Sequence, residues 1–119
     1  MTNGEDLSLE LAKEVMQLTR ELREKHENII SNQIGRSATS IGANMREAKC
    51  AASKRDFLNK LVIAFKESNE TLYWLELLPE LNMIDNDRLE RIKKKAKSLH
   101  FVLYRSIKTT KENMKKDKG

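Results

Sequence analysis

Apolar residues recur at intervals of three and four along most of this 119-residue chain. In the first such segment the steps are 4, 3 and 4, through Leu11, Val15, Leu18 and Leu22. This spacing places the side chains on one face of an α-helix, whereas a strand would need strict two-residue alternation. Only one proline, Pro79, and a few short polar stretches interrupt the pattern. The sequence therefore predicts an all-α protein.

The polar stretches divide the chain into four helical segments. The expected helices span about residues 7–25, 30–52, 54–78 and 87–113, with a frayed tail at 115–119. The expected helix N-caps are Asp6, Ser53 and either Asp85 or Asp87. Four helices of this length with short connections favour a single domain (residues 1–119) folded as an antiparallel up-and-down four-helix bundle.

The segment at 54–78 is apolar on more than one side. Beyond its core stripe it carries further apolar or aromatic residues, namely Val62, Ile63, Phe65, Tyr73 and Trp74. A helix that is apolar nearly all round is buried on more than one side. A chain of this size has one bundle core, so we expect another copy of the chain to cover Tyr73 and Trp74. This pattern predicts a homo-oligomer.

Two glycines, Gly35 and Gly42, lie inside the second helical segment. Glycine in a helix interior costs about 1 kcal/mol relative to alanine. Small residues on one side of a helix let a neighbouring backbone approach closely. We therefore expect Gly35 and Gly42 to mark tight packing against a neighbour, and we assign them to the oligomer interface.

Polar residues form another stripe on the same segment. The stripe steps by 4, 3, 4 and 3, through Gln33, Ser37, Ser40, Asn44 and Glu47. We expect these side chains to form hydrogen bonds at a seam between helices or subunits. Contact with a ligand or nucleotide is the alternative.

Basic residues are concentrated in the last part of the chain. Residues 1–85 carry 11 Lys/Arg and 14 Asp/Glu, a net charge of −3, whereas residues 86–119 carry 12 and 4, a net charge of +8. The candidate nucleic-acid contacts are Arg91, Lys94, Lys97, Arg105, Lys108 and Lys111. Phe101 lies among them, either as an interface anchor or as a stacking platform for bases.

This charge distribution supports two functional hypotheses. The first is an oligomer that binds RNA or DNA through phosphates, with little sequence specificity. The second is a protein–protein adaptor or structural oligomer, in which the lysines only keep an apolar assembly in solution.

Residue patterns typical of catalysis or metal binding are missing from the sequence. His26 and His100 have no carboxylate or cysteine at metal-ligand spacing. Glu67 and Glu70 share a helical face but lack the Glu-x-x-His partner of bundle metal sites, so we expect them to form ion pairs. Cys50 has no histidine nearby, and no phosphate-binding loop or nucleophile elbow occurs. We expect no enzymatic activity, cofactor, metal or small-molecule substrate.

The chain also lacks features that direct proteins to membranes or secretion. No apolar run approaches the roughly 18 residues of a membrane span. The N-terminus is acidic, unlike a secretory signal, and a single cysteine suits a reducing compartment. We expect a cytoplasmic location and no membrane partner.

Two stretches resemble a known family. Residues 33–48, QIGRSATSIGANMREA, are similar to the family pattern Q-x-x-R-S-x-x-S-I-x-A-N-x-x-E-A, which adds Arg36 to the polar stripe. Residues 66–78, KESNETLYWLELL, are similar to K-E-x-x-E-T-x-Y-W-L-x-L-L. These patterns are those of four-helix-bundle proteins related to proteins encoded in rRNA intervening sequences and, more distantly, to accessory proteins of diversity-generating retroelements.

The resemblance implies an antiparallel four-helix bundle that assembles into a ring-like homo-oligomer, expected to be a pentamer. Its retroelement relatives imply a basic, nucleic-acid-binding barrel, with RNA or single strands at least as favoured as duplex DNA. Most members of the family have no assigned biochemical activity.

Overall fold

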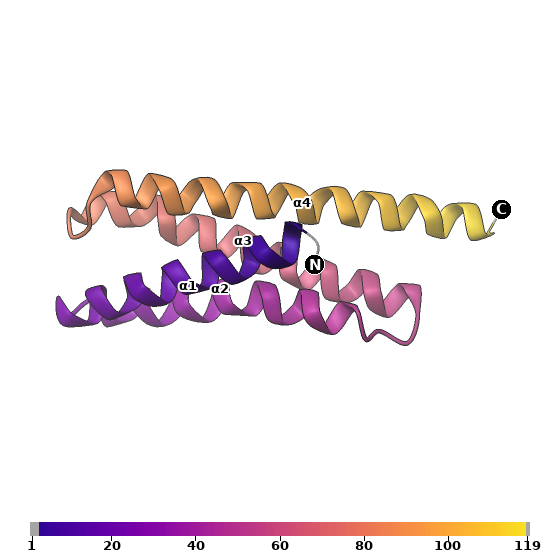
Figure 1. The fold of residues 1–119 in the computed structure, drawn as a ribbon, viewed down its shortest axis with the longest axis horizontal. Coiled ribbons are helices and arrows are strands. Elements are labelled where there is room, and N and C mark those ends of the chain that lie inside the picture. The colour runs from indigo at the N-terminus through magenta and orange to yellow at the C-terminus, as the bar shows by residue number, and fades with distance from the viewer. Residues whose placement is uncertain (1–2, 119) are drawn as a thin grey trace.

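Four α-helices form within residues 3–118, the part of the chain that the computed structural model describes. They are α1 (Asn3–Glu24), α2 (Asn28–Ala48), α3 (Lys54–Leu77) and α4 (Asn86–Lys118), with a short 3-10 helix, η1 (Leu78–Leu81), before α4. Successive helices run in opposite directions, as Figure 1 shows, and α4 packs against both α3 and α1. The described chain is all-α, as predicted, and measures 55 × 23 × 21 Å.

The helix starts show which expected caps are used. α1 already includes Asp6 in its first turn, so Asp6 is not the cap that the sequence suggested, although a carboxylate there still favours the helix dipole. α2 is capped by Glu27, whose side chain accepts a hydrogen bond from the backbone N of Ile30 at 2.8 Å. Ser53 caps α3 as predicted, accepting from the backbone N of Asp56 at 3.1 Å.

The connection between α3 and α4 follows the local sequence. Pro79 cannot continue the α-helix because it lacks a backbone N–H, and the chain tightens into η1. Asn82 then takes a left-handed conformation with φ 55°, which asparagine tolerates. Of the two expected caps for α4, Asp85 is the one used, because its side chain accepts from the backbone N of Arg88 at 3.4 Å while Asp87 lies inside the helix.

Two helix ends differ from the sequence-based expectation. α2 ends at Ala48, four residues earlier than expected. Residues 49–52 form the connection to Ser53, which is extended (φ −150°, ψ 167°) and caps the next helix. α4 continues past residue 113 and is helical to its last described residue, Lys118, whereas Gly119 of the expected frayed tail lies outside the described residues. An ion pair between Lys54 and Asp117 ties these last turns to the start of α3.

The core is built from apolar residues of all four helices, with fully buried side chains such as Leu18, Ile34, Leu75 and Leu99. Among the additional apolar residues of α3, Phe65 and Trp74 pack partly against this core. In contrast, Ile63 and Tyr73 remain 41% and 57% exposed. One chain therefore leaves part of the apolar surface of α3 uncovered, as the sequence pattern indicated.

The two glycines of α2 face α1 of the same chain. A Cβ atom at Gly42 would lie 2.9 Å from the Oγ and 3.3 Å from the Cβ of Ser8, which is closer than side chains normally approach. A Cβ atom at Gly35 would meet Thr19 Cγ2 at 3.4 Å, an ordinary contact. The sequence pattern predicts that both glycines lie at an oligomer interface. The structure instead gives them a close neighbour within the chain, and only Gly42 requires the absence of a side chain.

Buried hydroxyl groups connect neighbouring helices. Ser37 Oγ lies 2.8 Å from Thr71 Oγ1 between α2 and α3, which is the seam contact expected of the polar stripe. Ser68 Oγ lies 2.6 Å from Nδ1 of His100 between α3 and α4. The His100 ring also stacks on Phe65 with ring centroids 4.3 Å apart, and burial lowers its pKa below the usual value. His100 is thus a packing residue.

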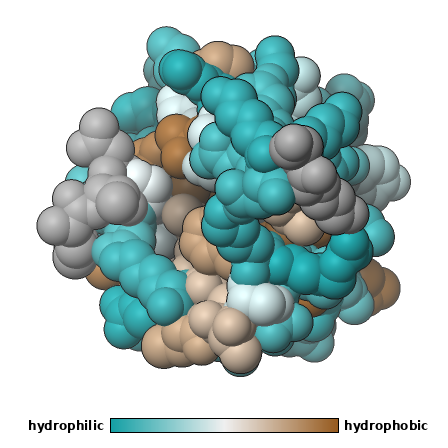
Figure 2. All heavy atoms as spheres, turned by 90° about the vertical axis from the view of Figure 1, so that its right-hand side faces the viewer, coloured by the Kyte–Doolittle hydropathy of each residue, from teal (hydrophilic) through white to brown (hydrophobic). Residues whose placement is uncertain are grey.

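One end of the bundle is more open than the other. α1 begins near the middle of α4, so α4 extends well beyond it (Figure 1). At this end apolar side chains of three helices, including Met45, Phe57 and Val102, line an open cavity of about 290 Å³ beside Lys49 and Glu5. Figure 2, which views this end, shows apolar atoms between the hydrophilic side chains that surround them.

Candidate nucleic-acid interface

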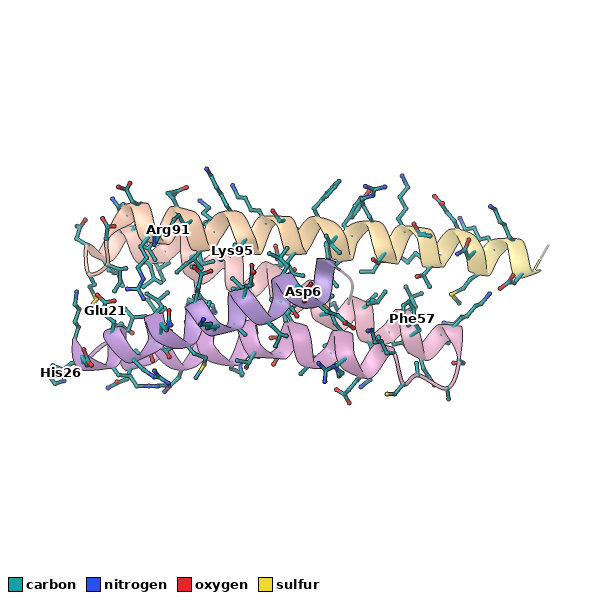
Figure 3. All side chains as sticks on the ribbon, viewed as in Figure 1. Asp6, Glu21, His26, Phe57, Arg91 and Lys95 are labelled. Carbon is teal, nitrogen blue, oxygen red and sulfur yellow. The ribbon has the colours of Figure 1, made fainter. Side chains whose placement is uncertain are left out.

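The cations of α4 fall into two groups, and the first faces α1. Lys95 Nζ lies 2.8 Å from Glu14 Oε2 and 3.7 Å from Glu10 Oε2, and Arg88 pairs with Glu21. Figure 3 shows Lys95 in the space between α4 and α1. The close contact with the Glu14 carboxylate raises the pKa of Lys95, so the lysine stays protonated. These cations are neutralised within the chain and attach α4 to α1.

The second group forms what we call the outer face of α4. It comprises Arg91, Lys94, Lys97, Phe101, Arg105, Lys108 and Lys111, which are the predicted nucleic-acid contacts, and all are exposed. Long side chains ending in nitrogen project here away from the other helices, as Figure 3 shows. Within residues 3–118, none of its six cations forms an ion pair. The outer face is therefore a row of cations without ion-pair partners among the described residues.

Two aromatic rings stand on this outer face. Phe101 is 58% exposed, and the guanidinium carbon of Arg105 lies 5.8 Å from its ring centroid, within cation–π range. Tyr104 is 51% exposed and was not singled out from the sequence. The sequence signal that could have identified Tyr104 is its position three residues after Phe101 and outside the core stripe. Residues three apart are neighbours on a helix surface.

Part of the polar stripe of α2 lies at the seam with α3. Arg36 donates a hydrogen bond to Glu67 at 3.0 Å and pairs with Glu70, so both glutamates form the ion pairs that the sequence predicted. Trp74 Nε1 also donates to Glu70 Oε2, at 3.1 Å. Burial opposes ionisation of Glu70, but the hydrogen bonds from Trp74 and Arg36 outweigh it and lower the pKa of the carboxyl group. This network connects α2 with α3.

The remaining members of the stripe have weaker or local contacts. Asn44 Nδ2 donates to the backbone O of Ser40 within α2, at 2.9 Å. Glu47 Oε1 lies 3.8 Å from Lys60 Nζ of α3, and Gln33 is exposed. The stripe is therefore a mixture of seam contacts and surface residues, without a shared binding geometry.

Comparison with known proteins gives these motifs a family context. The family described as 23S rRNA-intervening sequence protein matches residues 5–105. The chain belongs to this family. A crystal structure from Bacteroides thetaiotaomicron VPI-5482, of a protein with unknown function from the S23 ribosomal protein family, is similar with a TM-score of 0.85 and 46% sequence identity. That similarity covers 88% of this chain and 98% of the other. No curated protein matches the chain.

The family match bears on the site in two ways. It includes the α2 and α3 motifs that carry the sequence resemblance, and the seam network of Arg36 belongs to these motifs. The match also includes α4 as far as Arg105, so the matched residues contain most of the outer face. Lys108 and Lys111 lie beyond the matched residues.

A metal centre and a reactive thiol are two other kinds of site that a helical bundle can hold. Residues 3–118 contain no group of three or more His, Cys, Asp and Glu side chains placed to hold a metal ion. Cys50 is an exposed free thiol at the end of α2. Among the described helices, none combines the length and apolar character that crossing a membrane requires.

Proposed function

We propose that this member of the 23S rRNA-intervening-sequence family is a non-enzymatic protein that binds RNA or DNA through the outer face of α4. The observation that carries the proposal is the division of the α4 cations. Lys95 would have to break its pair with Glu14 before it could contact a phosphate. Lys94, its neighbour in sequence, has no such pair to break and points away from the bundle.

Binding of this kind is electrostatic and largely independent of sequence. Lysine and arginine side chains that neutralise phosphates release condensed counterions, which supplies most of the free energy of non-specific binding. Contacts to phosphates position a protein on a nucleic acid without identifying bases. The family name refers to 23S rRNA intervening sequences, which supports including RNA among the ligands tested.

The direct test is a salt titration of binding to three ligands: single-stranded RNA, single-stranded DNA and duplex DNA. We expect all three to bind at low salt, with log affinity falling linearly as log salt rises. Fluorescence anisotropy at several salt concentrations measures both quantities. Absence of binding to all three at low salt would overturn the proposal and favour a protein–protein adaptor.

We also propose that the chain assembles into a ring-like homo-oligomer, a pentamer on the basis of the family resemblance. The support is the apolar surface that one chain leaves uncovered on α3, where Tyr73 is 57% exposed beside Trp74, with the two rings edge to face at 5.0 Å. A ring would repeat the outer face of α4 around its axis. Repetition increases the affinity for a long polyanion because later contacts become intramolecular.

Sedimentation equilibrium tests the assembly. We expect a multiple of the 13.8 kDa chain mass at micromolar concentration, and a lower mass for Tyr73→Glu, because a charge at a buried apolar contact is costly. Glu76→Gln, on an exposed position of the same helix, is the control and should keep the wild-type mass. A monomeric wild-type protein would contradict this proposal.

A further inference from the structure

We propose that Phe101 and Tyr104 form a base-stacking platform, which makes the outer face of α4 selective for single-stranded nucleic acid. The inference rests on the proposed function and names its ligand more narrowly. Both rings are more than half exposed, at 58% and 51%. They line one open depression of about 390 Å³ together with Arg105, Lys108, Thr109 and Glu112.

The two rings are not required by the core of the bundle. The side of α4 that faces the core is filled by Leu99 and Leu103, both completely buried. Phe101 and Tyr104 lie outside this stripe, so most of their apolar surface stays in contact with water in the single chain. A ligand that covers the rings would therefore gain hydrophobic contact without displacing a packing partner.

The charges around the rings determine which ligand fits. Lys97 and Arg105 are four residues before and after Phe101, and Lys108 is seven residues after it, so all lie on the same helical face. Glu112 is the carboxylate that lines the depression. Two copies that met through this same face would bring like charges together, and the cores of protein interfaces are depleted of charged residues. The ring proposed above would instead use the apolar surface of α3 around Tyr73. A ligand with negative charges and flat apolar groups has the complementary chemistry.

Single-stranded nucleic acid has both properties. Its phosphates can follow the cations while its unpaired bases stack on aromatic side chains, a contact that tolerates any base. In a duplex the bases are stacked on each other and paired, so their faces are not available to the rings. The guanidinium of Arg105, 5.8 Å from the centroid of the Phe101 ring, adds a second flat cationic surface beside the platform.

The decisive experiment compares two single strands that differ only in their bases. One is an oligothymidylate of about twelve nucleotides, within the usual range of single-strand site sizes, and the other is an abasic strand of the same length. Wild-type protein should bind the oligothymidylate more tightly than the abasic strand. In Phe101→Ala/Tyr104→Ala the ratio of the two affinities should fall toward one. The affinity for oligothymidylate should decrease by about 5- to 150-fold per stacked base.

Two controls make the result specific. The exchange variant Phe101→Tyr/Tyr104→Phe keeps both rings and should bind both strands as the wild type does. The double alanine variant should retain wild-type affinity for the abasic strand and for duplex DNA, because its cations are unchanged. It should also keep the wild-type mass in sedimentation.

The outcomes separate this inference from the function on which it rests. Equal wild-type affinity for oligothymidylate and the abasic strand would overturn the platform while leaving phosphate binding intact. Dissociation of an oligomer in the double alanine variant would also overturn it, by showing that the rings contact a second copy. Failure of the wild type to bind either strand at low salt would instead remove the proposed function itself.

Discussion

Neutralising four exposed cations of α4 should weaken the binding of RNA, single-stranded DNA and duplex DNA by similar factors, on the order of 10²- to 10³-fold at about 0.1 M salt. The variant carries glutamine in place of Lys94, Lys97, Arg105 and Lys108. Each lost phosphate contact should also make the plot of log affinity against log salt shallower, by at most about 0.9 on duplex DNA and about 0.7 on single strands. Salt-titrated anisotropy measures both effects. The fold should remain intact, because these side chains point away from the core.

A charge-matched control shows whether the location of the cations matters. Glutamine in place of Lys13, Arg20, Arg23 and Lys66 removes the same charge from exposed positions of α1 and α3. These four residues form no ion pair with other described residues. We expect this control to lose much less affinity than the α4 variant. Equal losses would indicate an effect of net charge alone, and an unchanged affinity in the α4 variant would favour the adaptor hypothesis.

The sequence predicts the architecture well because helical periodicity depends on local spacing. The stripes through Leu18 and Leu99 are fully buried, and Ser53 caps α3 as its position suggests. The errors occur where a boundary depends on the rest of the chain. Residues 49–52 lie outside α2 and connect it to the Ser53 cap, and α4 continues to a contact with Lys54.

The candidate site was only partly predictable for a related reason. Lys94 and Lys95 are chemically identical and adjacent, yet only Lys95 meets carboxylates of α1. Helical spacing within α4 already places Lys94, and not Lys95, on the side opposite the core. The pairing of Lys95 with Glu10 and Glu14 depends on the register of α1 beside α4, which that spacing does not specify. The same limitation hid the close neighbour of Gly42, because sequence alone could not distinguish Ser8 of the same chain from a second subunit.

The family motifs indicate more about the fold than about the function. The residues that carry the resemblance, such as Arg36, Ser37 and Glu70, are engaged in hydrogen bonds and ion pairs between α2 and α3. These contacts give the motif residues a structural role, which is to hold α2 and α3 together. The outer face of α4 makes no comparable contribution to the core, which leaves it available for binding.

Replacing Gly42 by leucine should destabilise the protein although leucine is the better helix former. Leucine gains roughly 0.8 kcal/mol of helix propensity over glycine. Its Cβ would nevertheless lie 2.9 Å from Ser8 Oγ and 3.3 Å from Ser8 Cβ, and overpacking of this kind typically costs about 1–3 kcal/mol. We expect a net loss of about 0.2–2 kcal/mol in the free energy of unfolding, which lowers Tm by roughly 3–6 °C for each kcal/mol. Thermal unfolding followed by circular dichroism measures this change.

Gly35 supplies the matched control because a Cβ there meets Thr19 at an ordinary 3.4 Å. Gly35→Ala should therefore raise the free energy of unfolding, by up to about 1 kcal/mol. The distal carbons of a leucine at position 42 can turn toward the shallow groove beside Leu9, but its Cβ is fixed by the helix backbone. In Gly42→Ala the close contact with Ser8 should offset most of the stability gained from helix propensity. Gly35→Ala should keep that gain. If Gly42→Leu unfolds at a higher temperature than the wild type, close approach of α1 is not the reason for glycine at this position.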